Sequence, residues 1–171
     1  MADRDANSTL VQTEAQPVES KKSRSRAGSI RARSQARRCV MQALYQWQLT
    51  QQTFSEILAQ FIERNEYKTA DASYFHALLS GSIEHQLELS ARIGEFADRP
   101  WSQLDPIERA ILLIGMYELL HCPEVPYRVV VNEAVELTKQ FGATDGYKYI
   151  NALLDRVARV VRAGERQHSR H

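Results

Sequence analysis

The sequence has few of the residues that mark secreted or metal-stabilised proteins. Among its 171 residues there are only two cysteines, Cys39 and Cys122, and neither lies in a spacing typical of metal ligands. We therefore expect no disulfide framework and no zinc site. The first 20 residues carry acidic side chains and no apolar run, so no secretory signal is recognised there. These absences predict a cytoplasmic protein.

A catalytic constellation is also missing. His76, His85 and His121 are scattered along the sequence, and no serine or cysteine lies in a recognisable nucleophile motif. No glycine-rich loop follows a strand, and Glu133 and Glu136 are interpreted as a solvated helix face rather than a catalytic pair. We expect a protein that is not an enzyme and that has no cofactor, metal or catalytic residue.

No segment alternates apolar and polar residues as a strand would, and no internal repeat is visible. Apolar residues recur instead at helical spacing. The sequence therefore predicts an all-α fold of about seven helices. They are expected over Arg31–Leu49, over Phe54–Arg64, after Asp71, from Leu89 toward Arg99, over Asp105–Leu120, from Pro126 to a stop at Gly142, and over Thr144–Val161.

The helix expected over Asp105–Leu120 organises the others. Asp105 can cap its first turn, and Glu108 can complete a capping box with it. The middle of this run is apolar at nearly every position, whereas a surface helix would have a single apolar stripe. We therefore expect this helix to be surrounded by other helices, with Ile111 and Ile114 buried.

The two ends of the chain lack this periodicity. Residues 1–30 are rich in Ser, Ala, Gln and charge, and are expected to be a disordered extension. Residues 162–171 are polar and are expected to be a flexible tail. This leaves residues 31–161 as one helical domain.

Acidic residues are absent from residues 21–55, which carry eight basic side chains. The net charge of the whole chain is only +1, because residues 1–20 sum to −3 and residues 56–171 sum to −4. A basic block on a mildly acidic body favours a polyanionic partner that docks at one place.

The helix expected over residues 31–49 concentrates this charge on one face. With Arg38 at zero and about 100° per residue, Arg31 falls near +20° and Tyr45 near −20°. Arg37 lies on the flank of this face, and Arg33 precedes it. Arginines that contact phosphates beside an exposed aromatic ring are typical of single-stranded RNA binding. A solvated basic face, with Tyr45 packed on a neighbouring helix, remains the alternative.

A second candidate region covers residues 141–151, FGATDGYKYIN. Phe141 ends one expected helix and Tyr149 lies early in the next. Asp145 falls in the first turn, where its charge complements the helix dipole. A simple corner between two helices, with Asp145 as a local cap, remains the alternative.

Three segments resemble the NusB family of transcription antitermination factors: RARSQARRCVMQALYQWQL (31–49), DPIERAILLIGMYELLHC (105–122) and VPYRVVVNEAVELTKQFG (125–142). The resemblance covers about residues 31–160. It implies two small helical bundles that share a long buried central helix. It also implies binding of boxA RNA on nascent ribosomal transcripts together with NusE, a small-subunit ribosomal protein, in an antitermination complex with RNA polymerase.

The resemblance also assigns residues. Its RNA-binding positions fall on Arg31, Arg33, Arg37, Arg38, Tyr45, Phe141, Asp145, Lys148 and Tyr149, and its NusE-facing acid falls on Glu108. Two other functions remain open. One is a helical protein-interaction adaptor without RNA, and the other is a stand-alone relative of the RNA-binding domain of an rRNA cytosine methyltransferase. A homodimer that hides the basic face also remains open.

Overall fold

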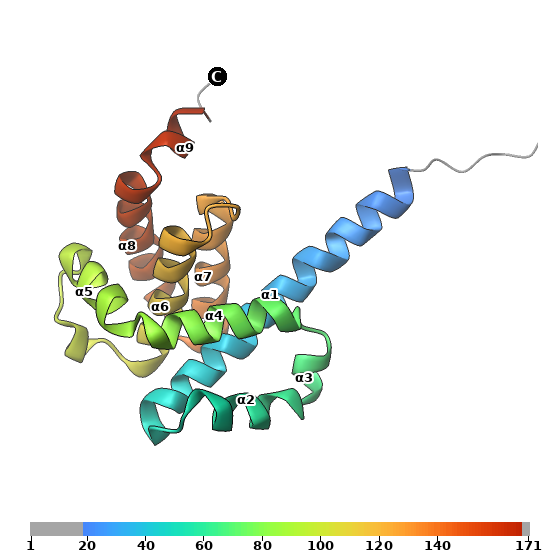
Figure 1. Cartoon of the computed structure of the whole chain (residues 1–171). Coiled ribbons are helices and arrows are strands. Elements are labelled where there is room, and N and C mark those ends of the chain that lie inside the picture. Colours follow the sequence, from blue (N-terminus) through green and yellow to red (C-terminus); the bar gives the residue numbers. More distant parts are fainter. Residues whose placement is uncertain (1–18, 169–171) are drawn as a thin grey trace, which may run out of the picture.

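The computed structural model describes the backbone of residues 19–168 and the side chains of residues 23–165. All regular structure in this part of the chain is helical, which confirms the all-α class (Figure 1). Two short helices that sequence periodicity could not reveal, α3 and α9, join the seven that were expected. The elements are α1 (Glu19–Thr50), α2 (Phe54–Ile62), α3 (Asn65–Lys68), α4 (Ala72–Glu84), α5 (Gln86–Phe96), the 3₁₀-helix η1 (Trp101–Gln103), α6 (Pro106–His121), α7 (Tyr127–Phe141), α8 (Gly146–Val161) and α9 (Ala163–His168).

Helix α6 lies at the centre, packed against α1, α4, α5, α7 and α8. Its start has the expected capping box. Asp105 Oδ1 accepts hydrogen bonds from the backbone N–H groups of Ile107 (2.8 Å) and Glu108 (2.9 Å), and the Glu108 carboxylate accepts one from the backbone N–H of Asp105 (3.3 Å). Ile111 and Ile114 are 0% and 1% exposed, which confirms that both lie in the core.

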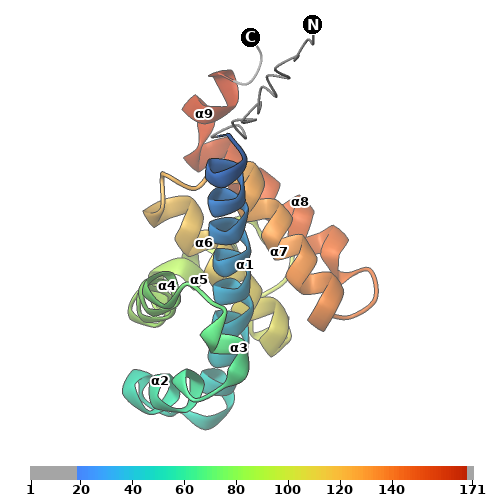
Figure 2. The same cartoon turned by 90° about the vertical axis from the view of Figure 1, so that its right-hand side faces the viewer.

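Two groups of helices share α6. In the first, α1 packs against α2, α3 and α4; in the second, α7 packs against α8, and α8 also contacts α5. Figure 2 shows α1 running along the front of the molecule, with α2 and α3 near its lower end and α7 beside it. This arrangement is the pair of bundles implied by the resemblance. Across the described residues, no helix combines the length and apolar content needed to span a membrane.

Helix α1 begins at Glu19, so the expectation of a disordered segment up to residue 30 was wrong for residues 19–30. The N-terminal part of α1 projects from the helical body (Figure 1), and the side chains of residues 23–31 are exposed. A helix that buries no face shows no apolar period, which is why the pattern in the sequence starts only near Arg31. The first 18 residues, where disorder was also expected, lie outside the described part.

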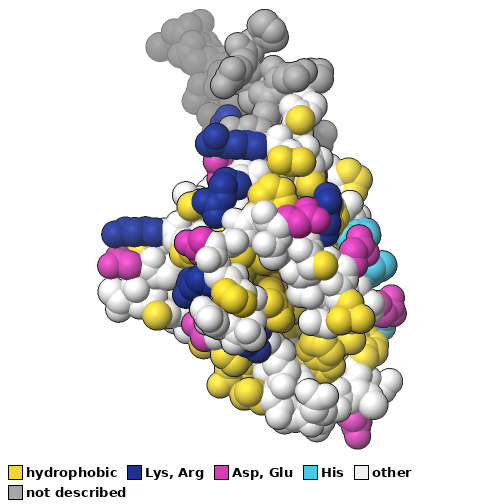
Figure 3. All heavy atoms as spheres, turned by 90° about the vertical axis from the view of Figure 1, so that its left-hand side faces the viewer, with side chains coloured by type: hydrophobic (Ala, Val, Ile, Leu, Met, Phe, Trp, Pro, Cys, Tyr) yellow, Lys and Arg dark blue, Asp and Glu magenta, His cyan; other side chains and the backbone are white. Residues whose placement is uncertain are grey.

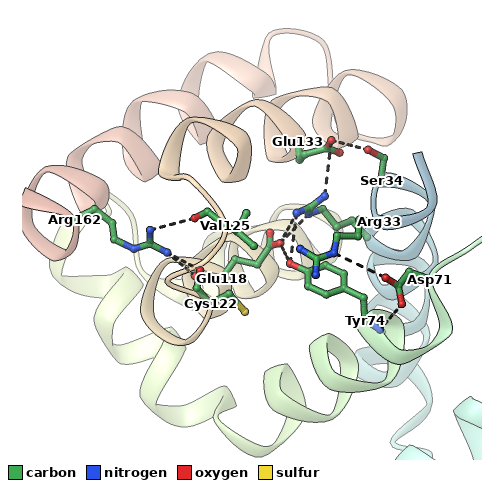
Figure 4. Close-up of polar contacts among 10 residues, drawn as sticks. Arg33, Ser34, Asp71, Tyr74, Glu118, Cys122, Val125, Glu133 and Arg162 are labelled. Carbon is green, nitrogen blue, oxygen red and sulfur yellow. Dashed lines mark hydrogen bonds and ion pairs between the residues drawn. The ribbon is translucent and has the colours of Figure 1, made fainter. Parts of the chain in front are cut away.

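The expectation that residues 162–171 form a flexible tail was wrong at Arg162, which is only 9% exposed. Its guanidinium satisfies backbone acceptors where α6 ends, and it also donates to the Glu165 carboxylate at 2.6 Å. Figure 4 shows part of this arrangement. The four carbonyl oxygens that accept from Arg162, at 2.8–3.1 Å, belong to Glu118, Leu119, Cys122 and Val125. The polar sequence after Val161 therefore begins with a structural residue, and α9 follows it.

Candidate nucleic-acid interface

Three residues of α1 form what we call the exposed α1 face: Arg31, Arg38 and Tyr45. Both arginines are exposed, and the Tyr45 residue is 39% exposed. A spacing of seven residues is close to two helical turns, so the three lie in one row along the helix. Ala36 and Val40 of the same helix are fully buried. The predicted division of α1 into a basic aromatic face and an apolar face is therefore present at these positions.

Arg33 lies beside this face and is partly buried. Its guanidinium carbon is 4.5 Å from the centroid of the Tyr74 ring, and its Nε is 3.9 Å from the Asp71 carboxylate. Both partners belong to the start of α4, where Asp71 caps the helix by accepting from the backbone N–H of Tyr74. Contacts to a phosphate would compete with these partners, so Arg33 is a weaker candidate than Arg31 or Arg38.

Arg37, a predicted RNA contact, is only 2% exposed, so its side chain is not accessible at the surface of this structure. Its Nε donates a 2.8 Å hydrogen bond to Glu118 Oε1 on α6, and its Nη2 lies 2.7 Å from the same oxygen. The Tyr74 hydroxyl also donates to Glu118, and the Glu133 carboxylate on α7 lies 3.8 Å from Arg37. We call Arg37, Tyr74 and Glu118 the buried arginine cluster.

The charge state of the buried arginine cluster follows from its partners. Burial alone would lower the pKa of Arg37, but the charge of Glu118 and its hydrogen bond outweigh this, and the pKa is raised. Arg37 is therefore a permanent buried cation paired with Glu118, which is 1% exposed. The helical-wheel position of Arg37 on the flank gave no hint of this pairing, because Glu118 comes from α6, far along the chain.

Glu133 has a different position from the one expected. It was interpreted as part of a solvated acidic face with Glu136, but its side chain is only 21% exposed. Glu133 Oε1 accepts a 2.6 Å hydrogen bond from the Ser34 hydroxyl. A cavity of about 300 Å³ between α1 and α7 is lined by Arg31 and Arg38 on one side and by Glu133 and Glu136 on the other. The negative charges of Glu133 and Glu136 reduce the positive potential around Arg31 and Arg38.

Phe141 joins the second predicted region to the first. The guanidinium carbon of Arg38 lies 5.2 Å from the centroid of the Phe141 ring. Tyr45 and Phe141 also line one groove of about 430 Å³, together with Arg64, which is the N-cap residue of α3, and Ile107 from α6. Two aromatic rings and an arginine therefore lie around one largely apolar groove, although their positions in the sequence are far apart.

Asp145 and Lys148 lie at the turn between α7 and α8. Asp145 occupies the N-cap position rather than the first turn, and its side chain makes no capping hydrogen bond, so the alternative of a local side-chain cap does not hold. Its φ of 63° lies in the left-handed region, where aspartate is tolerated better than most residues. The Asp145 carboxylate is 3.2 Å from Lys148 Nζ, and both side chains are more than 60% exposed. An exposed ion pair contributes little to stability, so a ligand could separate Asp145 from Lys148 at little energetic cost.

Tyr149 is partly buried against Arg99, whose guanidinium carbon lies 4.3 Å from the centroid of its ring. Burial raises the pKa of the Tyr149 hydroxyl, so it is neutral at physiological pH. Arg99 also lies 3.8 Å from the Glu108 carboxylate. Sequence reasoning missed Arg99, which connects the Tyr149 region to the start of α6. A base could stack on Tyr149 only from the face that Arg99 leaves open.

Glu108 is 8% exposed and completes the capping box of α6. In this local role its Oε2 accepts one hydrogen bond, from the backbone N–H of Asp105, while its Oε1 faces Arg99. The interaction with a protein partner that the resemblance assigns to it rests on the small exposed part of its carboxylate, beside Arg99.

The groove also contains residues that sequence reasoning did not select. Met41 and Leu49 lie one turn before and one turn after Tyr45 and line the same groove. Leu49 is 57% exposed. The signal that could have identified them is the apolar i, i+4, i+8 row that runs along α1 beside its arginines.

Known proteins resemble this chain over most of its length. The model of the NusB family matches residues 34–159. The transcription antitermination protein NusB of Thiobacillus denitrificans is 48% identical over 139 residues, covering 81% of this chain and 96% of that protein. The protein of the same name from Nitrosomonas eutropha is 42% identical over 160 residues, covering 94% and 95%. A solved structure of NusB from T. maritima has a TM-score of 0.67 and 24% identity over 74% of this chain and 90% of its own, which supports the fold alone.

Proposed function

This chain belongs to the NusB family and functions in transcription antitermination, and from that premise we propose that it binds boxA RNA of nascent ribosomal transcripts together with NusE. The pair would act within an antitermination complex that contains RNA polymerase. The proposed activity is binding rather than catalysis, and its place is the cytoplasm, where bacterial transcription occurs.

The observation that carries the RNA proposal is the groove lined by both Tyr45 and Phe141, with the Arg38 guanidinium lying over the Phe141 ring beside it. Arg38 offers charge for a phosphate, and the two rings offer flat surfaces for unpaired bases. Arg31 extends the row of charge along α1. Lys148 and Tyr149 continue the surface onto α8, while Arg37 contributes only through the packing of α1.

For NusE, we propose contact at the start of α6, where Glu108 and Arg99 lie together. A rim charge at an interface affects association more than the stability of the monomer. Glu108 also caps α6, so the two roles must be separated by experiment.

A protein-interaction adaptor remains the second candidate, favoured by the apolar lining of the groove around Leu49 and Phe141. An apolar groove can hold an apolar helix face as well as bases. A second copy of this chain placed there would cover Tyr45. RNA binding and dimerisation through this groove would then exclude each other.

Fluorescence anisotropy with labelled boxA-like RNA tests the proposal directly. The full chain should bind this RNA, and an equimolar amount of NusE should tighten the binding. A scrambled RNA of equal length provides the control for charge alone. Equal affinity for both RNAs, with and without NusE, would leave only a non-specific polyanion surface. Binding of NusE without any RNA binding would favour the adaptor.

Glu108 needs a matched pair of variants. Glu108→Gln keeps an oxygen acceptor for the capping box, whereas Glu108→Lys reverses the charge. We expect both to fold, with Glu108→Lys weakening NusE binding by more than its loss of stability explains. If the folded Glu108→Lys variant binds NusE like the wild type, Glu108 acts only as a local cap.

A further inference from the structure

His85, Glu88 and His121 lie together, although the sequence suggested scattered histidines and no metal site. His85 follows the last residue of α4, Glu88 lies in the first turn of α5, and His121 ends α6. His85 Nδ1 is 3.2 Å from Glu88 Oε2, and the ring centroids of His85 and His121 are 4.7 Å apart. One ligand atom from each residue lies within 4.8 Å of the other two.

These distances are close to those that a metal ion requires. Zn²⁺ binds imidazole nitrogen and carboxylate oxygen at about 2.0–2.2 Å, which places tetrahedral ligand atoms about 3.3–3.5 Å apart. The His85–Glu88 pair already meets this separation. The ligand atoms are at most 4.8 Å apart, so only a small adjustment of the exposed Glu88 and His121 side chains is needed, which leaves the core undisturbed.

The two imidazoles are also held in place. The Tyr117 ring lies between α4 and α6, 4.9 Å from His121 and 6.2 Å from His85 between ring centroids. It occupies the position beside Gly81 that a Cβ atom would otherwise fill, so the absence of a side chain at Gly81 allows this packing. Tyr117 therefore limits how far both histidine rings can move, which lowers the entropic cost of binding an ion.

The charge around the cluster favours a cation. Glu84 and Glu124 are exposed carboxylates that lie one residue before His85 and three residues after His121 in the sequence. Figure 3 shows histidine side chains beside acidic ones along the right-hand edge of the face of the molecule that it draws.

We propose that His85, Glu88 and His121 bind a first-row transition-metal dication, represented by Zn²⁺, which ties the α4–α5 corner to the C-terminal end of α6. Two imidazoles with one carboxylate form a known zinc ligand set that leaves a coordination position for water. Imidazole suits Zn²⁺, Ni²⁺ and Cu²⁺, whereas Mg²⁺ and Ca²⁺ require oxygen ligands. The site lies at the opposite end of α6 from Glu108, so it is independent of the proposed RNA and NusE surfaces.

Isothermal titration with Zn²⁺ tests this site. His168 and His171 are replaced by Gln in every protein used, so that the C-terminal histidines do not add binding. We expect one Zn²⁺ per chain and no Mg²⁺ binding. His85→Gln or His121→Gln should weaken Zn²⁺ binding by more than about 10-fold, which is the lower end of the loss seen even when a residue that only hydrogen-bonds to a metal ligand is changed. His76→Gln is the matched control, because His76 is an exposed histidine of α4 that packs on Phe54 instead.

Two further measurements do not depend on the site variants. Zn²⁺ at about 100 times its dissociation constant should raise the melting temperature by roughly 5–10 °C. Bound Cu²⁺ should show two nitrogen ligands by electron paramagnetic resonance. Absence of stoichiometric Zn²⁺ binding, equal binding by His121→Gln and His76→Gln, or a Cu²⁺ spectrum without two nitrogens would each overturn the proposal.

Discussion

Arg37 and Arg38 are neighbours in the sequence, yet one belongs to the buried arginine cluster and the other to the exposed α1 face. Arg37 is 2% exposed and is paired with Glu118, whereas Arg38 is exposed and lies over Phe141. Successive residues of a helix are about 100° apart, which is enough to separate core from surface. Residue type and local charge alone therefore do not identify which arginine can bind RNA.

The two regions also differ in what a substitution should affect. The buried arginine cluster holds α1 against α4 and α6, so changes there should alter folding. The exposed α1 face makes few contacts within the protein, so changes there should alter binding. The following predictions test this division.

Arg37→Ala should produce the largest effect. It leaves Glu118 buried without its cation, which costs about 3–5 kcal/mol. Denaturant titration measures this loss. Arg38→Ala is the matched control and should change stability by less than about 0.5 kcal/mol, as at most surface positions. Equal losses in the two variants would abolish the distinction between the regions.

A double substitution sharpens the same test. Replacing both members of a buried ion pair by apolar residues of similar size is often neutral or stabilising. Arg37→Met combined with Glu118→Leu should therefore recover most of the stability lost in Arg37→Ala. Failure to recover it would show that the Tyr74 hydroxyl, which also bonds to Glu118, carries more of the cost.

Ile111→Ala and Ile114→Ala provide the apolar comparison within the core. Both side chains are buried at the centre of α6, and their truncation should cost about 2–5 kcal/mol each. Denaturant unfolding of the two variants checks this. A loss below about 0.5 kcal/mol at both sites would mean that α6 does not organise the fold.

Tyr45→Ala should have the opposite effect to that expected for Arg37→Ala, because it should weaken RNA binding without destabilising the fold. The loss of a stacking ring should weaken RNA binding by about 1–3 kcal/mol, with little change in how affinity depends on salt. Anisotropy at four or five salt concentrations measures both quantities. If this variant unfolds, or binds RNA like the wild type, Tyr45 is a packing residue.

Arg31, Arg33 and Arg38 should control how the affinity for RNA depends on salt concentration. With Arg37 buried, three arginines remain, and at about −0.7 each they predict a log–log slope near −2 instead of the −3 expected for four. Arg38→Ala should make the slope shallower by about 0.7 and weaken all single-stranded RNAs alike. An unchanged slope would remove Arg38 from the phosphate contacts.

Deletion of residues 1–30 should have the smallest effect on stability. The side chains of residues 23–30 are exposed, so their removal exposes little apolar surface. We expect a shift in melting temperature within about 2 °C. A drop of several degrees in thermal unfolding would show that the start of α1 stabilises the domain.

The sequence by itself determined the all-α class, the position of α6 and its capping box, and the burial of Ile111 and Ile114. These features depend on periodicity and on residues three or four positions apart, which the sequence contains directly. It could not reveal the first turns of α1, because a helix that buries no side has no apolar period.

Only the tertiary structure decided the roles of particular polar residues. Arg37 became a core residue because Glu118 of α6 and Tyr74 of α4 meet it there, and Arg162 became a cap because the last carbonyls of α6 needed donors. The packing of separate helices likewise places Phe141 under Arg38 and the His121 ring beside the His85 ring. Each of these outcomes depends on a partner from another helix, and the burial of a charge is tolerated only where such a partner is present.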